Sequence, residues 1–494
     1  MNVGCGMTTG MRMRLICAAT ALLATTAGCG KRGAEPAAPT SPPLPPVQGA
    51  PEPTPKPEER PAFLDLPERT VPGRVFIIAI DGASWDVFDQ VLETGLMPNL
   101  GRIVAQGSRT ALESMDPTAS AILWTTIATG RKPKHHGVHG FVVKTPEGRT
   151  VPVSSTVRRV RAMWNIASEA GVSVGFISWW VTWPAEPVRG FMCSDYTWPL
   201  KKDEAGFATG ADADLDLPQR TYPPDLMKAL ERFIKTEDRL SPAELASLEL
   251  QAVRNIKSYA VRDILLKDVS VGNMSAYLLE RYKPSLVGVY FDGYDAFCHL
   301  YWPEYRRVLS TRAEGGEAAV RQLDPTVQAL GRSIESHLAR IDIDIGSILQ
   351  RTGPNDTVLV ISDHGFGDNP GRAPIQRTYD DWIQPPFWHH RQGILAASGG
   401  PIRKGQDGVA ATITDIAPTV LALLGLPVGK DMDGRVLTEL LTPEFLAQHP
   451  VRFVDTYDPA PRVSAPVESA YDEGMKNRLK ALGYIEDADE DDEE

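Results

Sequence analysis

The chain has 494 residues, 42% of them hydrophobic, and its 51 Lys and Arg against 63 Asp and Glu give a formal net charge of −12. This composition excludes a disordered chain and a polytopic membrane protein, and it suffices for one large domain or two ordinary ones. No Lys/Arg-rich patch favours nucleic-acid binding, and the five cysteines have no paired C-x-x-C spacing that would indicate a disulfide framework or a zinc knuckle.

The N-terminal residues have the pattern of an export signal. A basic start precedes the short apolar run LICAATALLATTAGC at 15–29, which predicts a secretory signal peptide over residues 1–28. Residues 26–29, TAGC, resemble the bacterial lipobox, whose cysteine is lipidated and becomes the first residue of the mature protein. This resemblance implies a lipid on Cys29, which would attach an exported protein to the membrane of the bacterial cell envelope (outer membrane or periplasmic face in a Gram-negative host). Cleavage by ordinary signal peptidase near the same point is the alternative.

The composition also sets the limits of the folded part. Residues 29–72 are interpreted as a lipid-anchored linker, because 13 prolines lie within 36–72 and proline at that density favours an extended spacer. Residues 486–494 contain eight acids, which predicts a solvated acidic tail. The folded domain is therefore expected over residues 73–485.

Strand and helix patterns alternate in this folded part. VFIIAI at 75–80 is a continuous apolar run, typical of a strand buried on both faces. Further buried strands are predicted at 172–178, 284–291, 356–362 and 393–398, and helices at 84–95, 97–107, 120–129, 157–170, 222–235, 241–282 and 319–352. This alternation indicates an α/β sandwich with a largely parallel central sheet. Residues 197–282 are polar and helical without strand patterns, and we interpret them as an insertion that forms a helical cap over the site.

Acidic and histidine residues accompany the ends of several predicted strands. They are Asp81 after the strand at 75–80, Asp295 and His299 after 284–291, Asp363 and His364 after 356–362, and His389 and His390 before 393–398. A single Asp at a strand end is more often a helix cap or a turn residue. The joint pattern is more informative, because functional residues of open α/β sheets gather at the carboxyl ends of strands. Carboxylates and imidazoles together suit a divalent ion, zinc first and manganese as the alternative.

Ser120 is the candidate nucleophile. It lies at the start of the helix predicted at 120–129, where backbone N–H groups favour an oxyanion or a phosphate. A nearby metal would activate its hydroxyl. Read locally, Thr118 or Ser120 can also be a simple helix N-cap.

The order of these segments resembles the type I phosphodiesterase/nucleotide pyrophosphatase family of the alkaline phosphatase superfamily. The segments that carry the resemblance are IIAIDGASWD (77–86), PTASAILWTTIATGRKPKHHGV (117–138), SWWVTWPAEPVRGFMCSDY (178–196), FDGYDAFCH (291–299), VISDHGFG (360–367), HHRQGILAASGGPI (389–402) and ALGYI (481–485). The resemblance implies a three-layer α/β/α sandwich and an alkaline phosphatase-like catalytic domain over 73–485.

The resemblance also implies two zinc ions and assigns their ligands. By motif, one ion would be held by Asp81, Ser120, Asp363 and His364, and the other by Asp295, His299 and His389. His389 is chosen because similar family members place this histidine four residues before the Gly of the next strand, here Gly393; His390 is the alternative. Asp292 is a weaker ligand candidate than Asp295.

The implied activity is hydrolysis of a phosphoric ester through a phosphoseryl intermediate on Ser120. Two departures bear on the substrate: the nucleotide pyrophosphatases have Thr at the position of Ser120 and a phosphate-contacting Asn at that of Leu123. The Cys-x-Pro-x-Arg nucleophile of formylglycine sulfatases is absent. The alternatives are a phosphotransferase acting on a phospho-headgroup and, ranked lower, a non-catalytic binding lipoprotein.

Overall fold

The computed structural model describes residues 71, 73–198, 200–202, 208–211, 217–235, 259–367, 388–460, 462, 465–481 and 484–485. The predicted signal peptide, Cys29, nearly all of the linker and the acidic tail lie outside these residues. Within the described ranges, no helix combines the length and the apolar character needed to cross a bilayer.

A nine-stranded sheet occupies the middle of the fold, in the strand order β15-β2-β14-β11-β1-β10-β5-β6-β9. In that order the strands are Ala411–Thr412, Ser108–Glu113, Gln392–Ser398, Thr357–Ile361, Val75–Ile80, Leu286–Phe291, Val174–Ile177, Gly190–Cys193 and Thr221–Tyr222. The run from β11 to β6 is parallel. β14 is antiparallel to β11 and β2, and β9 is antiparallel to β6. The predicted largely parallel sheet is thus confirmed.

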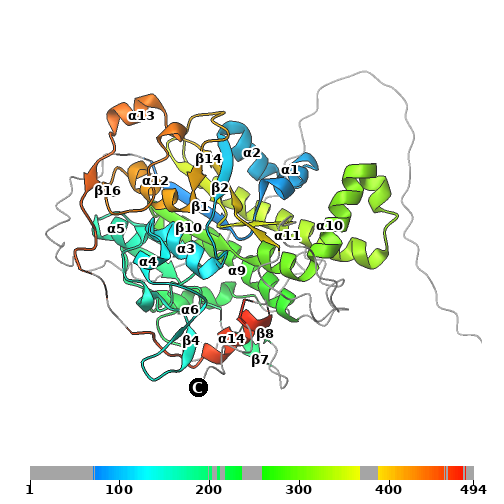
Figure 1. Ribbon diagram of the computed structural model, residues 1–494, viewed down its shortest axis with the longest axis horizontal. Helices are drawn as coiled ribbons and strands as arrows, with labels where there is room; N and C mark the ends of the chain where they lie inside the picture. Colours follow the sequence, from blue (N-terminus) through cyan, green and yellow to red (C-terminus); the bar gives the residue numbers. More distant parts are fainter. Residues whose placement is uncertain are drawn as a thin grey trace, which may run out of the picture. The chain divides into compact units, whose positions relative to one another are not determined.

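Helices cover both faces of this sheet (Figure 1). On one face lie α1 (Trp85–Glu93), α2 (Pro98–Gln106), α9 (Tyr259–Tyr282), α10 (Gly293–Val320) and α11 (Pro325–Leu349). On the other lie α3 (Ser120–Thr129), α5 (Met163–Glu169) and α12 (Ile416–Leu423). Together with the sheet they form the three-layer α/β/α sandwich that the sequence implied.

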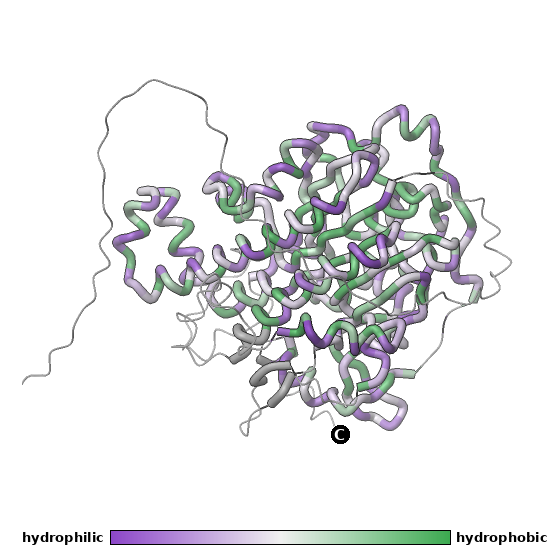
Figure 2. The backbone as a smooth tube through the Cα atoms, turned by 180° about the vertical axis from the view of Figure 1, so that it is seen from behind, coloured by the Kyte–Doolittle hydropathy of each residue, from purple (hydrophilic) through white to green (hydrophobic). Residues whose placement is uncertain are grey.

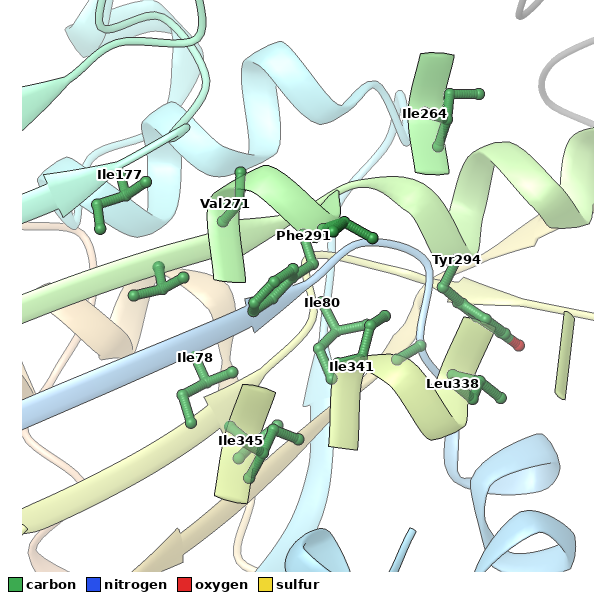
Figure 3. Packing of buried hydrophobic residues seen from close by; sticks show 14 of the residues in the cluster. Ile78, Ile80, Ile177, Ile264, Val271, Phe291, Tyr294, Leu338, Ile341 and Ile345 are labelled. Atoms are coloured by element: carbon green, nitrogen blue, oxygen red, sulfur yellow. The ribbon is translucent and has the colours of Figure 1, made fainter. Parts of the chain in front are cut away.

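The central strand β1 packs against both helical layers because its side chains alternate between the two faces. Ile78 and Ile80 join the cluster with α11, where Figure 3 shows them beside Ile341 and Ile345. Ile77, one position along, joins the opposite cluster. Figure 2 shows hydrophobic stretches of the chain gathered in the middle of the fold and hydrophilic ones around its outside.

The smaller elements complete the described fold. They are α4 (Pro133–His136), α6 (Leu226–Leu230), α13 (Pro443–Gln448), α14 (Asp472–Ala481), β3 (Val142–Lys144), β4 (Thr150–Pro152), β7 (Leu200–Lys202), β8 (Ala208–Ala211), β12 (Gly365–Phe366), β13 (His389–His390), β16 (Val428–Gly429), β17 (Phe453–Val454), and the 3-10 turns η2 (Ser155–Val157), η3 (Glu231–Phe233), η6 (Ile413–Asp415) and η7 (Thr438–Leu440).

Two predicted segments differ from the structure. The range 197–282 contains three short strands, β7, β8 and β9, so the expectation that it lacks strands was wrong. Its last part, α9, packs in the core cluster beside the sheet and belongs to the helical layer. The helix predicted at 157–170 begins only at Met163, because the Asn165 side chain accepts a hydrogen bond from Ala162 N–H at 2.9 Å and caps the helix there. The cap over the site stays a prediction.

Candidate metal centre

Three neighbouring parallel strands place the acidic residues together. β11, β1 and β10 are adjacent, so their carboxyl ends meet at one edge of the sheet. Asp81 directly follows β1, and its N–H donates to the carbonyl of Phe291 at the end of β10 at 3.0 Å. Asp295 lies in the first turn of α10, which begins just after β10, and Asp363 lies two residues past β11.

The first group of candidate ligands comprises Asp81, Asp363 and His364, all of them buried. His364 Nε2 lies 3.2 Å from Asp81 Oδ1 and 3.7 Å from Asp363 Oδ2. Ser120 is the first residue of α3, and its buried hydroxyl donates to Asp81 Oδ1 at 3.4 Å. Ser120 therefore lies beside the residues that the sequence assigned to one ion with it.

The second group lies around Asp295. His389 Nε2 is 3.2 Å from Asp295 Oδ1, and His299 Nε2 is 3.1 Å from Asp295 Oδ2. The two imidazole Nε2 atoms are 3.0 Å apart. Nitrogen lone pairs at that separation repel unless a proton or a cation lies between them, so this geometry suits a shared ion. His364 Nε2, 4.0 Å from Asp295 Oδ1, lies between the two groups.

Backbone carbonyls orient two of the imidazoles. His389 Nδ1 lies 3.0 Å from the carbonyl of Thr118, and His364 Nδ1 lies 3.2 Å from that of Gly365. Each ring can therefore donate from Nδ1, which assigns the Nε2 lone pair to the cluster. The contact of His389 with Thr118 also joins β13 to the loop that precedes Ser120.

The short pairing of β12 with β13 places His389 in the cluster and His390 outside it. His389 is opposite Phe366 and is buried, whereas His390 is opposite Gly365 and is half-buried. Successive residues of a strand point to opposite sides. The structure thus brings His389 to Asp295, in line with the choice made from the sequence.

The negative charges of the buried carboxylates in this cluster are not fully balanced by the protein's own side chains. Burial, and then the charge of Asp81, raise the pKa of Asp363 well above its usual value. Neither oxygen of Asp363 has a hydrogen-bond partner among the described residues. Burial opposes ionisation of Asp295, but His299 and His389 outweigh it and lower its pKa well below the usual range. An unpaired buried carboxylate next to other carboxylates is costly, and divalent cations remove that cost. The donor set therefore fits divalent cations.

Comparison with known proteins agrees with this geometry. The family model described as "Type I phosphodiesterase / nucleotide pyrophosphatase" matches residues 75–414, more than half of the chain. The chain belongs to this family. Its members are metal-dependent hydrolases of the alkaline phosphatase superfamily, so the recognition made from the sequence is confirmed. Among curated proteins, none matches this chain.

Several solved structures are similar at low identity. Murine ectonucleotide pyrophosphatase/phosphodiesterase 5, as an inactive variant in complex with AMP, is 14% identical with a TM-score of 0.42, over 75% of this chain and 100% of that one. The human counterpart is 14% identical with a TM-score of 0.41 and the same coverage. A 2-O GAG sulfatase is 12% identical with a TM-score of 0.44, over 75% and 74% of the two chains. The family assignment rests on the match over 75–414.

Three side chains beside the family's motif residues were not found from the sequence. Tyr290 and Trp124 both donate to Asp81 Oδ2, Trp124 at 3.1 Å, and Tyr484 donates to Asp295 Oδ2. Trp124 follows Ser120 by four residues on the same helix, which places both on one face and could have revealed it. Tyr484 lies in ALGYI (481–485), one of the segments that carry the resemblance, but nothing there indicated a contact with Asp295, and nothing in the sequence indicated one between Tyr290 and Asp81.

The structure gives Asp292 a different partner from the cluster. Asp292 Oδ2 lies 2.6 Å from Lys267 Nζ and 2.6 Å from Arg478 Nη2, and all three side chains are largely buried. A carboxylate that already neutralises two buried cations has little capacity left for a metal ion. The sequence-based preference for Asp295 over Asp292 agrees with this geometry.

Proposed function

We propose that the chain is a phosphoric ester hydrolase that uses Ser120 as its nucleophile and two divalent ions, zinc first and manganese as the alternative. The observation that carries the proposal is the position of Ser120. Its hydroxyl lies at the N-terminus of α3, within hydrogen-bond reach of Asp81 and at the edge of a buried group of carboxylates and imidazoles. Asp81, Ser120, Asp363 and His364 would hold one ion, and Asp295, His299 and His389 the other.

The proposed reaction is a double displacement at phosphorus. When bound, the ions would supply positive charge that stabilises the phosphate and the oxygens entering and leaving it. Asp81 accepts the hydrogen bond of the Ser120 hydroxyl and orients Oγ. Ser120 Oγ forms the new bond to phosphorus as the bond to the ester oxygen breaks, and the proton lost by Ser120 ends on the departing oxygen, which gives a phosphoseryl intermediate and an alcohol. Water then hydrolyses this intermediate and regenerates Ser120.

The position of Leu123 bears on the substrate class. In nucleotide pyrophosphatases the corresponding residue is an Asn that contacts phosphate. Here Leu123 is fully buried in the core cluster between α3 and the sheet. A buried aliphatic side chain cannot donate to a phosphate, so the proposal names phosphoric esters as a class and does not single out nucleotide diesters.

Replacement of the nucleophile tests the mechanism. Ser120→Ala should bind zinc nearly as the wild type does, since the carboxylates and imidazoles remain. Its turnover of a panel of phosphate mono- and diesters should fall by several orders of magnitude, and acid quenching should trap no phosphoserine. Ser120→Thr should keep measurable activity because it retains a hydroxyl. The product, measured with and without a sugar or lipid alcohol, distinguishes hydrolysis from phosphoryl transfer.

Thr125→Ala is the matched control on the same helix. Its hydroxyl is buried and donates to the carbonyl of Ala121 at 2.7 Å, away from the cluster. This variant should retain activity. Full activity of Ser120→Ala together with metal dependence would mean that the covalent mechanism is wrong.

We also propose that the protein is held at the cell envelope by a lipid on Cys29. The support is the lipobox-like TAGC at 26–29, followed by the Pro-rich linker. Mass spectrometry of the mature N-terminus should find Cys29 lipidated and in the first position, and Cys29→Ala should release the protein from the membrane fraction. A mature chain that begins at another, unmodified residue contradicts the anchor.

A further inference from the structure

Asp81 and Asp295, one from each ligand group, each accept a hydrogen bond from a tyrosine on one carboxylate oxygen. In each case the tyrosine hydroxyl donates to Oδ2: Tyr290 to Asp81 and Tyr484 to Asp295. Oδ1 of Asp81 lies 3.2 Å from His364 Nε2, and Oδ1 of Asp295 lies 3.2 Å from His389 Nε2. The other histidine of the second group, His299, has its Nε2 3.1 Å from Asp295 Oδ2. The two groups thus share a tyrosine on Oδ2 and a histidine beside Oδ1, although Asp81 and Asp295 follow different strands.

Tyr290 is fixed by its surroundings. It belongs to β10, its ring is fully buried, and it lies edge-on to Trp124 with ring centroids 5.0 Å apart. Its hydroxyl also accepts a hydrogen bond from Trp180 Nε1 at 2.6 Å. With Trp180 donating to it, the hydroxyl hydrogen of Tyr290 points to Asp81. Asp81 Oδ2 is therefore engaged by two neutral donors, Tyr290 and Trp124.

Tyr484 comes from the C-terminal segment, beyond the 75–414 range that matches the family. It follows α14, and its N–H donates to the carbonyl of Leu479 at 2.8 Å. Its ring stacks on Phe141 with centroids 4.8 Å apart and lies nearly perpendicular to the ring of His299, with centroids 5.3 Å apart. Arg478 ties the same helix to Asp292, three residues before Asp295.

We infer that Tyr290 and Tyr484 are positioning residues, one for each ion, which engage Oδ2 of Asp81 and of Asp295 and leave Oδ1 of each available to its own ion. This inference rests on the proposed two-ion function. It assigns a role in the site to the C-terminal segment, through Tyr484.

The physical reason is that a carboxylate offers two equivalent oxygens and can rotate between ligand arrangements. A neutral donor on one oxygen restricts this rotation without cancelling the negative charge, so the charge is kept for the cation. The donors must come from rigid parts of the fold. Tyr290 meets this need through the buried strand β10, and Tyr484 meets it through its stack on Phe141 and the ion pair of Arg478.

Zinc titration of the metal-free full chain, in competition with a chelating dye, tests the pairing. Wild type should bind two equivalents. Tyr484→Phe removes one hydroxyl and keeps the ring, and it should weaken one equivalent about 10- to 100-fold, the usual effect of losing such a donor, while the other stays unchanged. Tyr290→Phe should weaken the other equivalent by a similar factor.

Combination with ligand variants shows which ion each tyrosine serves. In an Asp295→Ala background, Tyr484→Phe should have no further effect on the remaining equivalent, whereas Tyr290→Phe should still weaken it. In an Asp81→Ala background the two outcomes should be exchanged. A merely structural role would make each tyrosine variant weaken the remaining equivalent in both backgrounds.

Tyr305→Phe is the matched control. Tyr305 is as buried as Tyr290 and lies on α10, and its hydroxyl has no hydrogen-bond partner among the described residues. It should leave both equivalents unchanged. Two wild-type zinc affinities in Tyr484→Phe, or weakening of the same ion by both tyrosine variants, overturns this inference and leaves the hydrolase proposal intact. A wild-type chain that binds no zinc removes the proposed function and this inference with it.

Discussion

Gly82, directly after Asp81, has two features that exclude a side chain. Its φ is +71°, in the left-handed region that L-residues adopt at a cost of about 1–2 kcal/mol. A Cβ at this position would lie 2.7 Å from Asp295 Oδ1. The close approach of the first loop to Asp295 therefore depends on the missing side chain.

Gly82→Ala should lower the free energy of unfolding and also weaken zinc binding, because the new methyl group displaces Asp295. Gly95→Ala is the control: its φ is +73°, but nothing lies within 4 Å of the added Cβ. In that variant the free energy of unfolding should fall only by the cost of the left-handed backbone conformation, about 1–2 kcal/mol, and zinc should bind normally. Urea denaturation and zinc titration measure the two effects, and equal zinc affinities in both variants would contradict the argument.

His136 is a buried neutral histidine outside the metal centre. Its Nδ1 accepts from Val138 N–H at 3.1 Å, and its Nε2 lies 3.0 Å from the hydroxyl of Thr126, which itself donates to the carbonyl of Ile122 at 2.9 Å. Nε2 must therefore carry the hydrogen. Nδ1 already accepts a hydrogen bond, so a second proton on the ring would break that bond. Burial, and then the charge of His139, lower the pKa of His136 to about 3.

The lowered pKa makes stability depend on pH in one direction. Below the pKa of about 6.5 that the histidine has in the unfolded chain, the unfolded chain binds a proton that the native chain does not bind. The contribution of His136 is thus complete above pH 6.5 and is lost as the pH falls toward 3. Between pH 8 and pH 5 the stability advantage of wild type over His136→Gln should shrink by about 2 kcal/mol. Urea denaturation of wild type and His136→Gln at the two pH values measures this change.

At the scale of elements, one buried carboxylate joins three segments of the chain. Asp292 lies between β10 and α10, Lys267 lies on α9 and Arg478 on α14, and both cations contact Asp292 Oδ2. Burial opposes the charge on Asp292, yet Lys267 and Arg478 outweigh it and hold the pKa of Asp292 below its usual value. This triad connects the helical layer to the C-terminal helix.

Asp292→Asn should be strongly destabilising, by about 3–5 kcal/mol, because it leaves two buried cations without their counter-charge. Asp455→Asn is the comparison at the surface, where the pair of Lys430 with Asp455 is exposed to solvent, so its loss should have little effect on stability. Chemical denaturation of both variants measures the difference. Similar small losses would show that the triad does not hold α14 in place.

At the scale of the whole molecule, the proposed ions should link binding to folding. Without them, the carboxylates of Asp81, Asp295 and Asp363 are buried close together. Each ion present at 100 times its dissociation constant should add about 2.7 kcal/mol to the stability of the folded chain. Exhaustive chelation should therefore lower the melting temperature and abolish ester hydrolysis, and zinc should restore both.

Ser120→Ala separates the two effects of chelation. It should keep most of the zinc-dependent rise in melting temperature but remain inactive at every zinc concentration. Hydrolysis by wild type that survives exhaustive chelation would remove the two-ion proposal. A melting temperature that does not respond to zinc would mean that the buried carboxylates are neutralised in another way.

The sequence by itself determined five of the nine strands of the central sheet, β1, β5, β10, β11 and β14, and the edge at which the site lies. Continuous apolar runs such as 75–80 can be recognised from the local sequence, because a strand buried on both faces needs an apolar side chain at every position. The acids and histidines at the strand ends could be recognised for a second reason: parallel strands place their carboxyl ends together. Helix bounds were predicted less well: the helix predicted at 157–170 begins only at Met163.

Only the tertiary structure decided which side chains complete the site. Tyr484 lies 189 positions from Asp295 along the chain, and Tyr290 lies 209 positions from Asp81, so no local period relates them. Their hydroxyls reach the aspartates because β10 is the neighbour of β1 in the sheet and because α14 is tied to Asp292. Hydrophobic periodicity determines which face of an element is buried, whereas contacts between distant elements depend on how the layers pack, and that information is not local in the sequence.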